Sequence, residues 1–174
     1  MVTDARSIKL PLTPLLEGIE KDDLAPLLAE ATRLELEADQ TVSSEGARAD
    51  AFFVMVAGAV EVTHRDAFGD QHLLAELGPG AVLCETAIFL DKQEATISTI
   101  APSTLLRLPI EGFKDLVSDG NPAAVQVLFN IARSLAVRLQ AADKRLGQPR
   151  VSNLGAQSHI IRSRASSRQN YINR

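Results

Sequence analysis

Residues 33–108 are divided into short apolar segments separated by turn residues. The segment 51–57 (AFFVMVA) is apolar on both faces, which is typical of a strand in the middle of a sandwich. The segment 60–63 alternates apolar with polar residues, so one of its faces would contact solvent. Roughly eight short strands at regular spacing predict an antiparallel sandwich or jelly roll.

Most of the expected strands end at glycine, proline or acidic turn residues. They comprise residues 33–37, 41–44, 51–57, 60–63, 73–77, 81–83, 95–101 and 104–108. Residues 66–70 have the composition of a hairpin loop.

Helical patterns precede and follow this region. Residues 22–32 carry leucines at helical spacing, and residues 111–117 form a second short amphipathic segment. Asn121 followed by Pro122 is typical of a helix start, and a long helix is expected over residues 122–146. The predicted fold is therefore mainly β with flanking helices and a long C-terminal helix.

Apolar residues repeat along this long helix at alternating spacings of three and four. They are Val125, Leu128, Ala132, Leu135, Leu139, Ala142 and Leu146. A period of 3.5 residues is typical of a seam between two helices, and it predicts a homodimer. The alternative is that the stripe covers the chain's own sandwich.

The charge is distributed unevenly along the chain. Residues 147–174 contain five arginines and no acidic residue, which leaves a charge of −9 on the remainder of a chain with a formal net charge of −4. An acidic body is a poor nucleic-acid binder, because neutralisation of phosphates drives that affinity. The 28-residue tail is too short for a DNA-binding domain, its composition predicts disorder, and it is a candidate contact for a protein partner.

Several other classes of protein are disfavoured. No apolar run is long enough to span a membrane and no secretory signal is visible, which together with the single cysteine favours a cytoplasmic protein. His64 and His72 flank the hairpin loop, but the chain has no His-x-His pair, catalytic triad order or phosphate-binding glycine motif. We expect neither an enzyme nor a metal site.

Residues 77–97 have the features of a pocket for a small anion. The turn Gly78-Pro79-Gly80 leads into a short strand, and Cys84-Glu85 then begins a brief helical run. A polar loop, 91–94, precedes the next strand. A helix N-terminus beside a loop presents amide groups to an anion.

In order, these pieces resemble the cyclic nucleotide-binding domain of the catabolite activator protein and of the regulatory subunits of cAMP-dependent protein kinase. The resemblance covers residues 12–146, which gives a domain over 1–146 and a basic tail over 147–174. It rests on Pro14-Leu15-Leu16-Glu17-Gly18, Glu45-Gly46, Asp50, Phe53-Val54, Val56-Ala57-Gly58-Ala59-Val60, Leu77-Gly78-Pro79-Gly80, Glu85, Ala87, Ala95-Thr96-Ile97, Leu105, Arg107, Leu108 and Phe113. It implies an eight-stranded antiparallel jelly roll flanked by helices.

The resemblance also implies a phosphate-binding cassette, in which a glutamate binds the ribose hydroxyl and an arginine pairs with the cyclic phosphate. Glu85 matches the glutamate, and Cys84 replaces the glycine before it. The arginine position falls on Gln93 or Glu94, and the nearest basic residue is Lys92. If binding is retained, the contacts would come from Cys84, Glu85, Thr86, Ala87, Lys92, Gln93, Glu94, Ala95 and Thr96.

Loss of one partner from a buried charge pair costs about 2–5 kcal/mol. We therefore expect cAMP binding to be weak or absent. The favoured hypothesis is a non-enzymatic regulatory or interaction module that acts through protein partners. The alternative is a genuine sensor of a cyclic nucleotide or related small ligand, in which the long helix relays binding.

Overall fold

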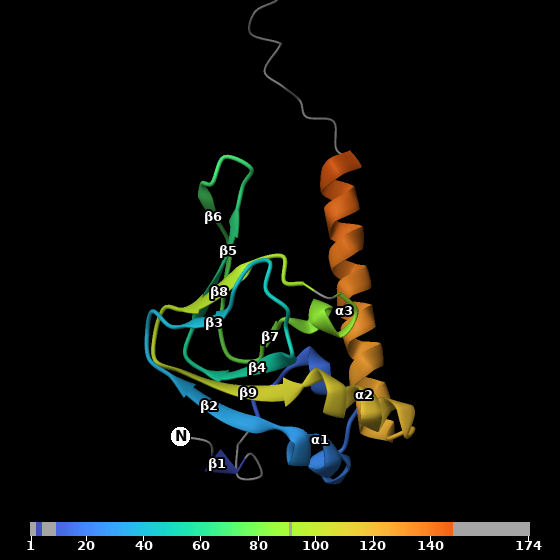
Figure 1. The fold of residues 1–174 in the computed structure, drawn as a ribbon. Coiled ribbons are helices and arrows are strands. Elements are labelled where there is room, and N and C mark those ends of the chain that lie inside the picture. Colours follow the sequence, from blue (N-terminus) through green and yellow to red (C-terminus); the bar gives the residue numbers. More distant parts are fainter. Residues whose placement is uncertain (1–2, 5–9, 91, 148–174) are drawn as a thin grey trace, which may run out of the picture. The chain divides into compact units, whose positions relative to one another are not determined.

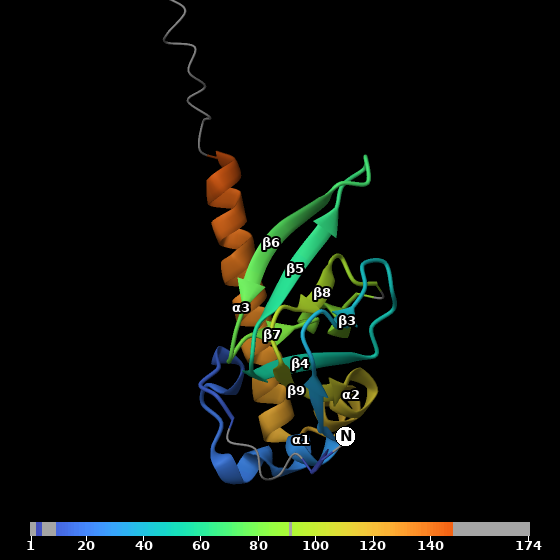
Figure 2. The same cartoon turned by 90° about the vertical axis from the view of Figure 1, so that its left-hand side faces the viewer.

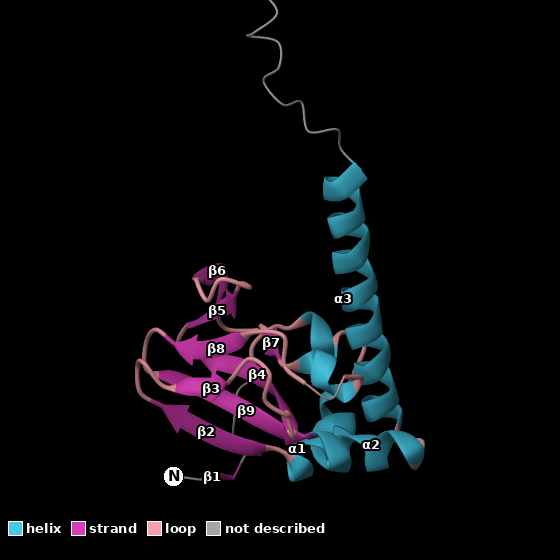
Figure 3. Cartoon of the chain, turned by 45° about the horizontal axis from the view of Figure 1, so that its top comes forward, coloured by secondary structure: helices cyan, strands magenta, loops and turns pink. Residues whose placement is uncertain are grey.

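The computed structural model describes residues 3–4, 10–90 and 92–147. The chain divides into two units, residues 1–135 and 136–174, and both sheets belong to the first. Figures 1 and 3 show the strands gathered into a jelly roll with helices beside it. The predicted fold class, a mainly antiparallel β domain with flanking helices, is confirmed.

The described strands form two antiparallel sheets. In spatial order, the first contains β1 (Thr3–Asp4), β2 (Thr32–Leu36), β9 (Ser103–Pro109), β4 (Ala51–Ala57) and β7 (Val82–Leu83). The second contains β3 (Thr41–Ser43), β8 (Thr96–Thr99), β5 (Val60–Arg65) and β6 (Gln71–Leu77). Strand β1 was not predicted; β2 to β9 correspond to the eight expected strands.

Strand β4 lies between β9 and β7, as its two apolar faces predicted. Phe53 and Met55 belong to a core cluster with residues of the second sheet, such as Val60. Phe52 and Val54 belong to the other cluster, which includes the helices. The strand is therefore apolar throughout because it faces two cores, and Figure 1 shows it at the centre of the fold.

Six helical segments are described: η2 (Pro14–Leu16), η3 (Lys21–Leu24), α1 (Ala25–Glu30), η4 (Glu85–Ile88), α2 (Ile110–Ser118) and α3 (Pro122–Gly147). The helix expected over residues 22–32 begins as 3-10 and stops at Glu30, because Ala31 is extended and leads into β2. The Asn121 side chain accepts a hydrogen bond from the Ala124 amide at 3.0 Å, which confirms the predicted cap of α3.

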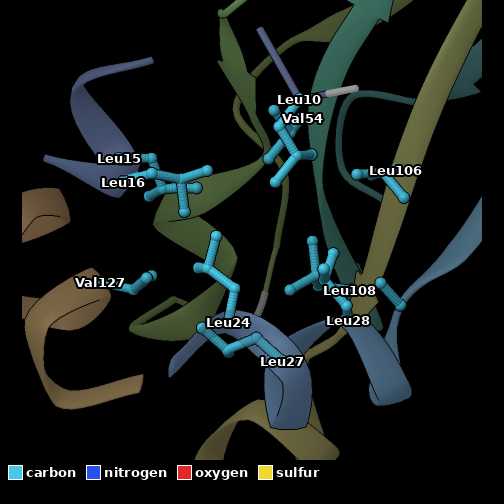
Figure 4. Close-up of a pocket in the computed structure, with 11 residues that line it drawn as sticks. Leu10, Leu15, Leu16, Leu24, Leu27, Leu28, Val54, Leu106, Leu108 and Val127 are labelled. Carbon is cyan, nitrogen blue, oxygen red and sulfur yellow. The ribbon is translucent and has the colours of Figure 1, made fainter. Parts of the chain in front are cut away.

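Between these helices and the sheet lies a small apolar cavity of about 30 Å³ (Figure 4). Leu15, Leu24 and Leu27 line it from the N-terminal segments, Val54 and Leu106 from the sheet, among others. A space of this size holds no organic ligand, so the cavity is a packing feature of the core.

The part of α3 up to Leu135 covers the chain's own sheet. Ala124, Val127 and Ile131 are buried, and Leu128 and Leu135 are partly buried against the same cluster. Two of the seven predicted seam residues, Leu128 and Leu135, therefore pack against the chain's own sandwich, as the alternative predicted.

The other described seam residues are exposed. Val125, Ala132, Leu139 and Ala142 are exposed, and Phe129 beside them is 62% exposed. The side chain of Leu146 lies outside the described residues, as does the basic tail from residue 148 onward. An apolar stripe on α3 is thus exposed among the described residues.

Within the described residues, no helix is long and apolar enough to cross a membrane. The same part of the chain contains no group of three metal-ligating side chains.

Candidate functional site

The turn 78–80 fixes the start of the predicted cassette. The Gly80 amide donates to the Met55 carbonyl at 2.9 Å, and the Met55 amide donates to the Ala81 carbonyl at 2.9 Å. Gly80 has φ +88°, and a Cβ there would lie 2.5 Å from the carbonyl oxygen of Leu12. Glycine is therefore required at this crossing, which places β7 beside β4.

Cys84 ends β7 in a left-handed conformation, with φ +61°. The helical run that follows, η4 (Glu85–Ile88), has only four residues. The amides of Phe89 and Leu90 both donate to the Thr86 carbonyl, which closes this short turn. So short a helix has little dipole, and the helix N-terminal anion site expected from the sequence is correspondingly weak.

The thiol of Cys84 is buried and unreactive in character. Burial and the negative charge of Glu85 raise its pKa and a hydrogen bond with Ser43 lowers it, with a net rise from 9.0 to about 11. A helix N-terminus can lower a thiol pKa, but burial dominates here. Cys84 is a small core residue in the place where the family pattern has glycine.

The remaining cassette residues divide into buried and exposed groups. Glu85, Ala87 and Gln93 are buried, whereas Lys92 and Glu94 are exposed. Thr86, Ala95 and Thr96 are half-buried. The residue that is buried at the predicted phosphate position is therefore the neutral Gln93.

Gln93 is 6% exposed, and its side-chain Nε2 has no hydrogen-bond partner among the described residues. A buried amide without a partner costs about 1–3 kcal/mol. Such a donor is a candidate contact for a ligand acceptor group.

Three hydrogen bonds join the cassette loop to the β3–β4 loop. The Gly46 amide donates to the Gln93 carbonyl at 2.8 Å, and the Gln93 amide donates to the Ala47 carbonyl at 2.9 Å. The Glu45 amide donates to Thr96 Oγ1 at 3.1 Å. Two segments about fifty residues apart in sequence thus form one wall.

The two histidines of the hairpin lie opposite each other, as their positions suggested. His64 pairs with His72 in the β5–β6 register. His64 Nδ1 lies 3.1 Å from the Glu45 carboxylate, and His72 Nε2 lies 2.9 Å from Asp66. Each histidine therefore has an acidic partner of its own.

A pocket of about 380 Å³ opens at the wall made by the β3–β4 loop. Its lining residues come from β3, the loop and the start of β4. They are Thr41, Val42, Ser43, Ser44, Ala47, Arg48, Ala49, Asp50, Ala51 and Phe53. The pocket adjoins the cassette through Ser43, which bonds to Cys84, and through Ala47, which bonds to Gln93.

Sequence reasoning did not identify this lining. Ser43 and Arg48 carry no motif, and their position follows from the pairing of β3 with β8, where Ser43 lies opposite Ile97. Only the register of that pairing, together with the loop contacts, brings them beside residues 84–96.

Taken together, the antiparallel jelly roll, the short helix after β7 and the flanking helices define the class of domain to which the chain belongs. Residues 33–119 match the cyclic nucleotide-binding domain. The chain belongs to that family.

The relatives include enzymes and regulators. The chain is 31% identical over 145 residues to Glutaminase 2 of Bradyrhizobium diazoefficiens, which covers 83% of this chain and 23% of the relative. It is 23% identical over 122 residues to a CRP-like cAMP-activated global transcriptional regulator of Mycobacterium tuberculosis, covering 70% of this chain and 54% of the relative. The chain thus spans about a quarter and about half of these two proteins.

Among solved structures, the catabolite activator protein of Thermus thermophilus is similar, with a TM-score of 0.70. The match has 24% identity and covers 77% of this chain and 62% of that one. This likeness concerns the fold.

Proposed function

We propose that this domain is a non-enzymatic regulatory module whose cassette does not hold a cyclic phosphate in the usual way. The observation that carries the proposal is that position 93 or 94, where the family pattern has its arginine, holds the buried, neutral Gln93 or the exposed, acidic Glu94. Between Cys84 and Thr96 the chain has one basic residue, Lys92, and its side chain is exposed. The loop therefore offers the phosphate no buried cation.

The energetic consequence follows from the strength of such pairs. An arginine holds a phosphate through two parallel charge-assisted hydrogen bonds, whereas an amide provides neutral donors only. Losing one side of a buried charge pair costs about 2–5 kcal/mol. Affinity for cAMP would accordingly be about 30-fold to several thousand-fold weaker than with an arginine present.

We propose that the domain acts on other proteins through α3. The helix is held to the N-terminal segment by Asn130 and by an ion pair between Arg133 and Glu17. The exposed apolar residues Val125, Phe129 and Leu139 suit a second α3 helix, so we propose a homodimer. The basic tail is a second proposed contact, with an acidic protein surface as its partner.

Calorimetric titration of the full chain with cAMP and cGMP tests the proposal. We expect no saturable binding at micromolar concentration. The variant Glu94→Arg, at an exposed loop position, should restore some affinity if a cation is what the loop lacks, and Lys92→Ala should change little. Micromolar binding of either nucleotide to the unaltered chain would overturn the proposal.

A second candidate function is a genuine ligand sensor. It is favoured by the buried carboxyl of Glu85 and by the pocket beside the cassette. In that case a ligand should raise the melting temperature, and Glu85→Ala should abolish the rise. An unchanged rise in the variant would exclude a ribose contact at Glu85.

A further inference from the structure

The β3–β4 loop carries an exposed cation, Arg48, beside the pocket that adjoins the cassette. Arg48 lines the pocket and forms no ion pair or hydrogen bond with any described residue. The other charged lining residue is Asp50, whose carboxylate is bound by Arg107 at 2.7 Å. Arg48 is therefore the one uncompensated charge among the described lining residues.

The surroundings of Arg48 contain further groups that suit an anion. Ser43, Ser44 and Thr41 bring hydroxyl donors to the same lining. The acids nearby are engaged elsewhere, since Glu45 binds His64 and the Arg65 amide. Because Asp50 is paired with Arg107, Arg48 is the lining charge that is left to contact an anion.

The neighbouring cassette loop contributes in a different way. The amide of Gln93 donates to the carbonyl of Ala47, the residue before Arg48. Gln93 is not itself a lining residue of the pocket. Its backbone amide holds the loop that carries Arg48 in place.

We propose that this pocket binds a small phosphate-bearing ligand whose anionic group is held by Arg48 from the β3–β4 loop. This inference rests on the regulatory role proposed for the domain and names the chemistry of its ligand. A guanidinium binds phosphate through two hydrogen bonds in a fixed geometry. The volume of about 380 Å³ accommodates a ligand of mononucleotide size or smaller.

The probes are inorganic phosphate, AMP, cAMP and adenosine, titrated into the full chain by calorimetry. Backbone amide shifts in nuclear magnetic resonance spectra report where each probe binds. At least one phosphate-bearing probe should bind at or below millimolar concentration and shift the amides of residues 43–49. Adenosine, which has no phosphate, should bind at least about tenfold more weakly than AMP.

The decisive variant is Arg48→Gln, which should weaken phosphate binding at least about tenfold. Arg48→Lys should retain part of the affinity, because it keeps the charge and loses the fork. The matched control is Arg65→Gln, which removes the same charge from an exposed position outside the lining. Arg65→Gln should bind as the unaltered chain does.

Three results would overturn the inference. The first is that Arg48→Gln and Arg65→Gln bind the phosphate-bearing probes with equal affinity. The second is that adenosine binds as tightly as AMP. The third is that no phosphate-bearing probe shows saturable binding at concentrations up to about 5 mM. The last result leaves the proposed loss of cyclic nucleotide binding intact. Tight binding of cAMP that requires Arg48 would instead overturn that proposal and support this inference.

Discussion

Asn130 on α3 donates its side-chain amide to the carbonyl of Leu15 at 2.9 Å, across 115 positions of sequence. The same nitrogen donates to the carbonyl of Glu17 at 2.9 Å, while Oδ1 accepts from Gln126 at 3.1 Å. One buried amide thereby satisfies two backbone acceptors of the N-terminal segment and holds it against α3.

Replacing Asn130 by leucine should therefore destabilise the domain. The two carbonyls would lose their donor in a buried environment, so the free energy of unfolding should fall by about 2–4 kcal/mol. Urea denaturation measures the change. The control is Gln126→Ala, which removes only the outer, half-buried bond and should cost under about 1 kcal/mol. Equal losses would show that helix propensity rather than the carbonyl contacts decides the result.

Gly58 should tolerate no side chain. Its φ is +90°, and a Cβ there would lie 2.2 Å from Ser103 Oγ and 2.5 Å from the Pro102 carbonyl. Gly58→Ala should lower the free energy of unfolding by about 2–4 kcal/mol, from left-handed strain and from the clash with backbone. Gly69 has φ +94° with open space around it, so Gly69→Ala isolates the strain and should cost about 1 kcal/mol. A smaller effect at Gly58 than at Gly69 would contradict this packing.

Position 84 should discriminate between residues by backbone conformation. At φ +61° a β-branched side chain is strongly disfavoured, so Cys84→Val should cost about 2–3 kcal/mol. Cys84→Gly removes the strain and loses a small buried side chain, and the two effects should nearly cancel to within about 1 kcal/mol. Thermal unfolding distinguishes the variants; a Cys84→Val protein as stable as the unaltered chain would exclude the left-handed conformation.

The same residue should give a pH dependence. The pKa of Cys84 rises from 9.0 to about 11 on folding, so above pH 9 the unfolded chain loses this proton while the folded chain keeps it. The contribution of this thiol to the free energy of unfolding is fully present below pH 9. It is lost as the pH rises toward 11, by about 1 kcal/mol between pH 9 and pH 10. The measurement is the difference in unfolding free energy between the unaltered chain and Cys84→Gly at pH 7 and pH 10. A difference that does not change with pH would contradict a buried thiol.

The exposed stripe of α3 should determine oligomeric state. Phe129→Lys and Leu139→Lys each place a charge where a second helix is proposed, and each should shift the mass measured by light scattering from dimer to monomer. Ser134→Lys adds the same charge at another exposed position on the helix and should leave the dimer intact. A chain that is already monomeric at high micromolar concentration would contradict the proposed homodimer.

The strands could be predicted because each has a pattern of its own. The two apolar faces of residues 51–57 and the Asn121-Pro122 start of α3 depend only on neighbouring residues. The face that α3 turns to the core could not be predicted in this way. Hydropathy would bury Phe129 and expose Asn130, whereas the structure does the reverse, because the carbonyls of Leu15 and Glu17 provide partners for the amide.

The candidate site could likewise be predicted only in part. Glu85, and Gln93 or Glu94, were identified from the family resemblance; Glu85 and Gln93 are buried and Glu94 is exposed. Arg48 was not identified from the sequence, because its place in the pocket depends on which loop faces the cassette. That arrangement is set by hydrogen bonds from Gly46 and Glu45 to residues fifty positions away.

The hydrogen bonds between these two loops also bear on how fast a ligand would bind. Because Gly46, Ala47 and Gln93 are already joined, the wall is ordered before any ligand arrives. Binding to such a preorganised wall loses little conformational entropy and requires no coupled folding. Association should therefore proceed in a single kinetic phase with a small change in heat capacity. The conformational entropy of the two loops is lost when the chain folds and not when the ligand binds.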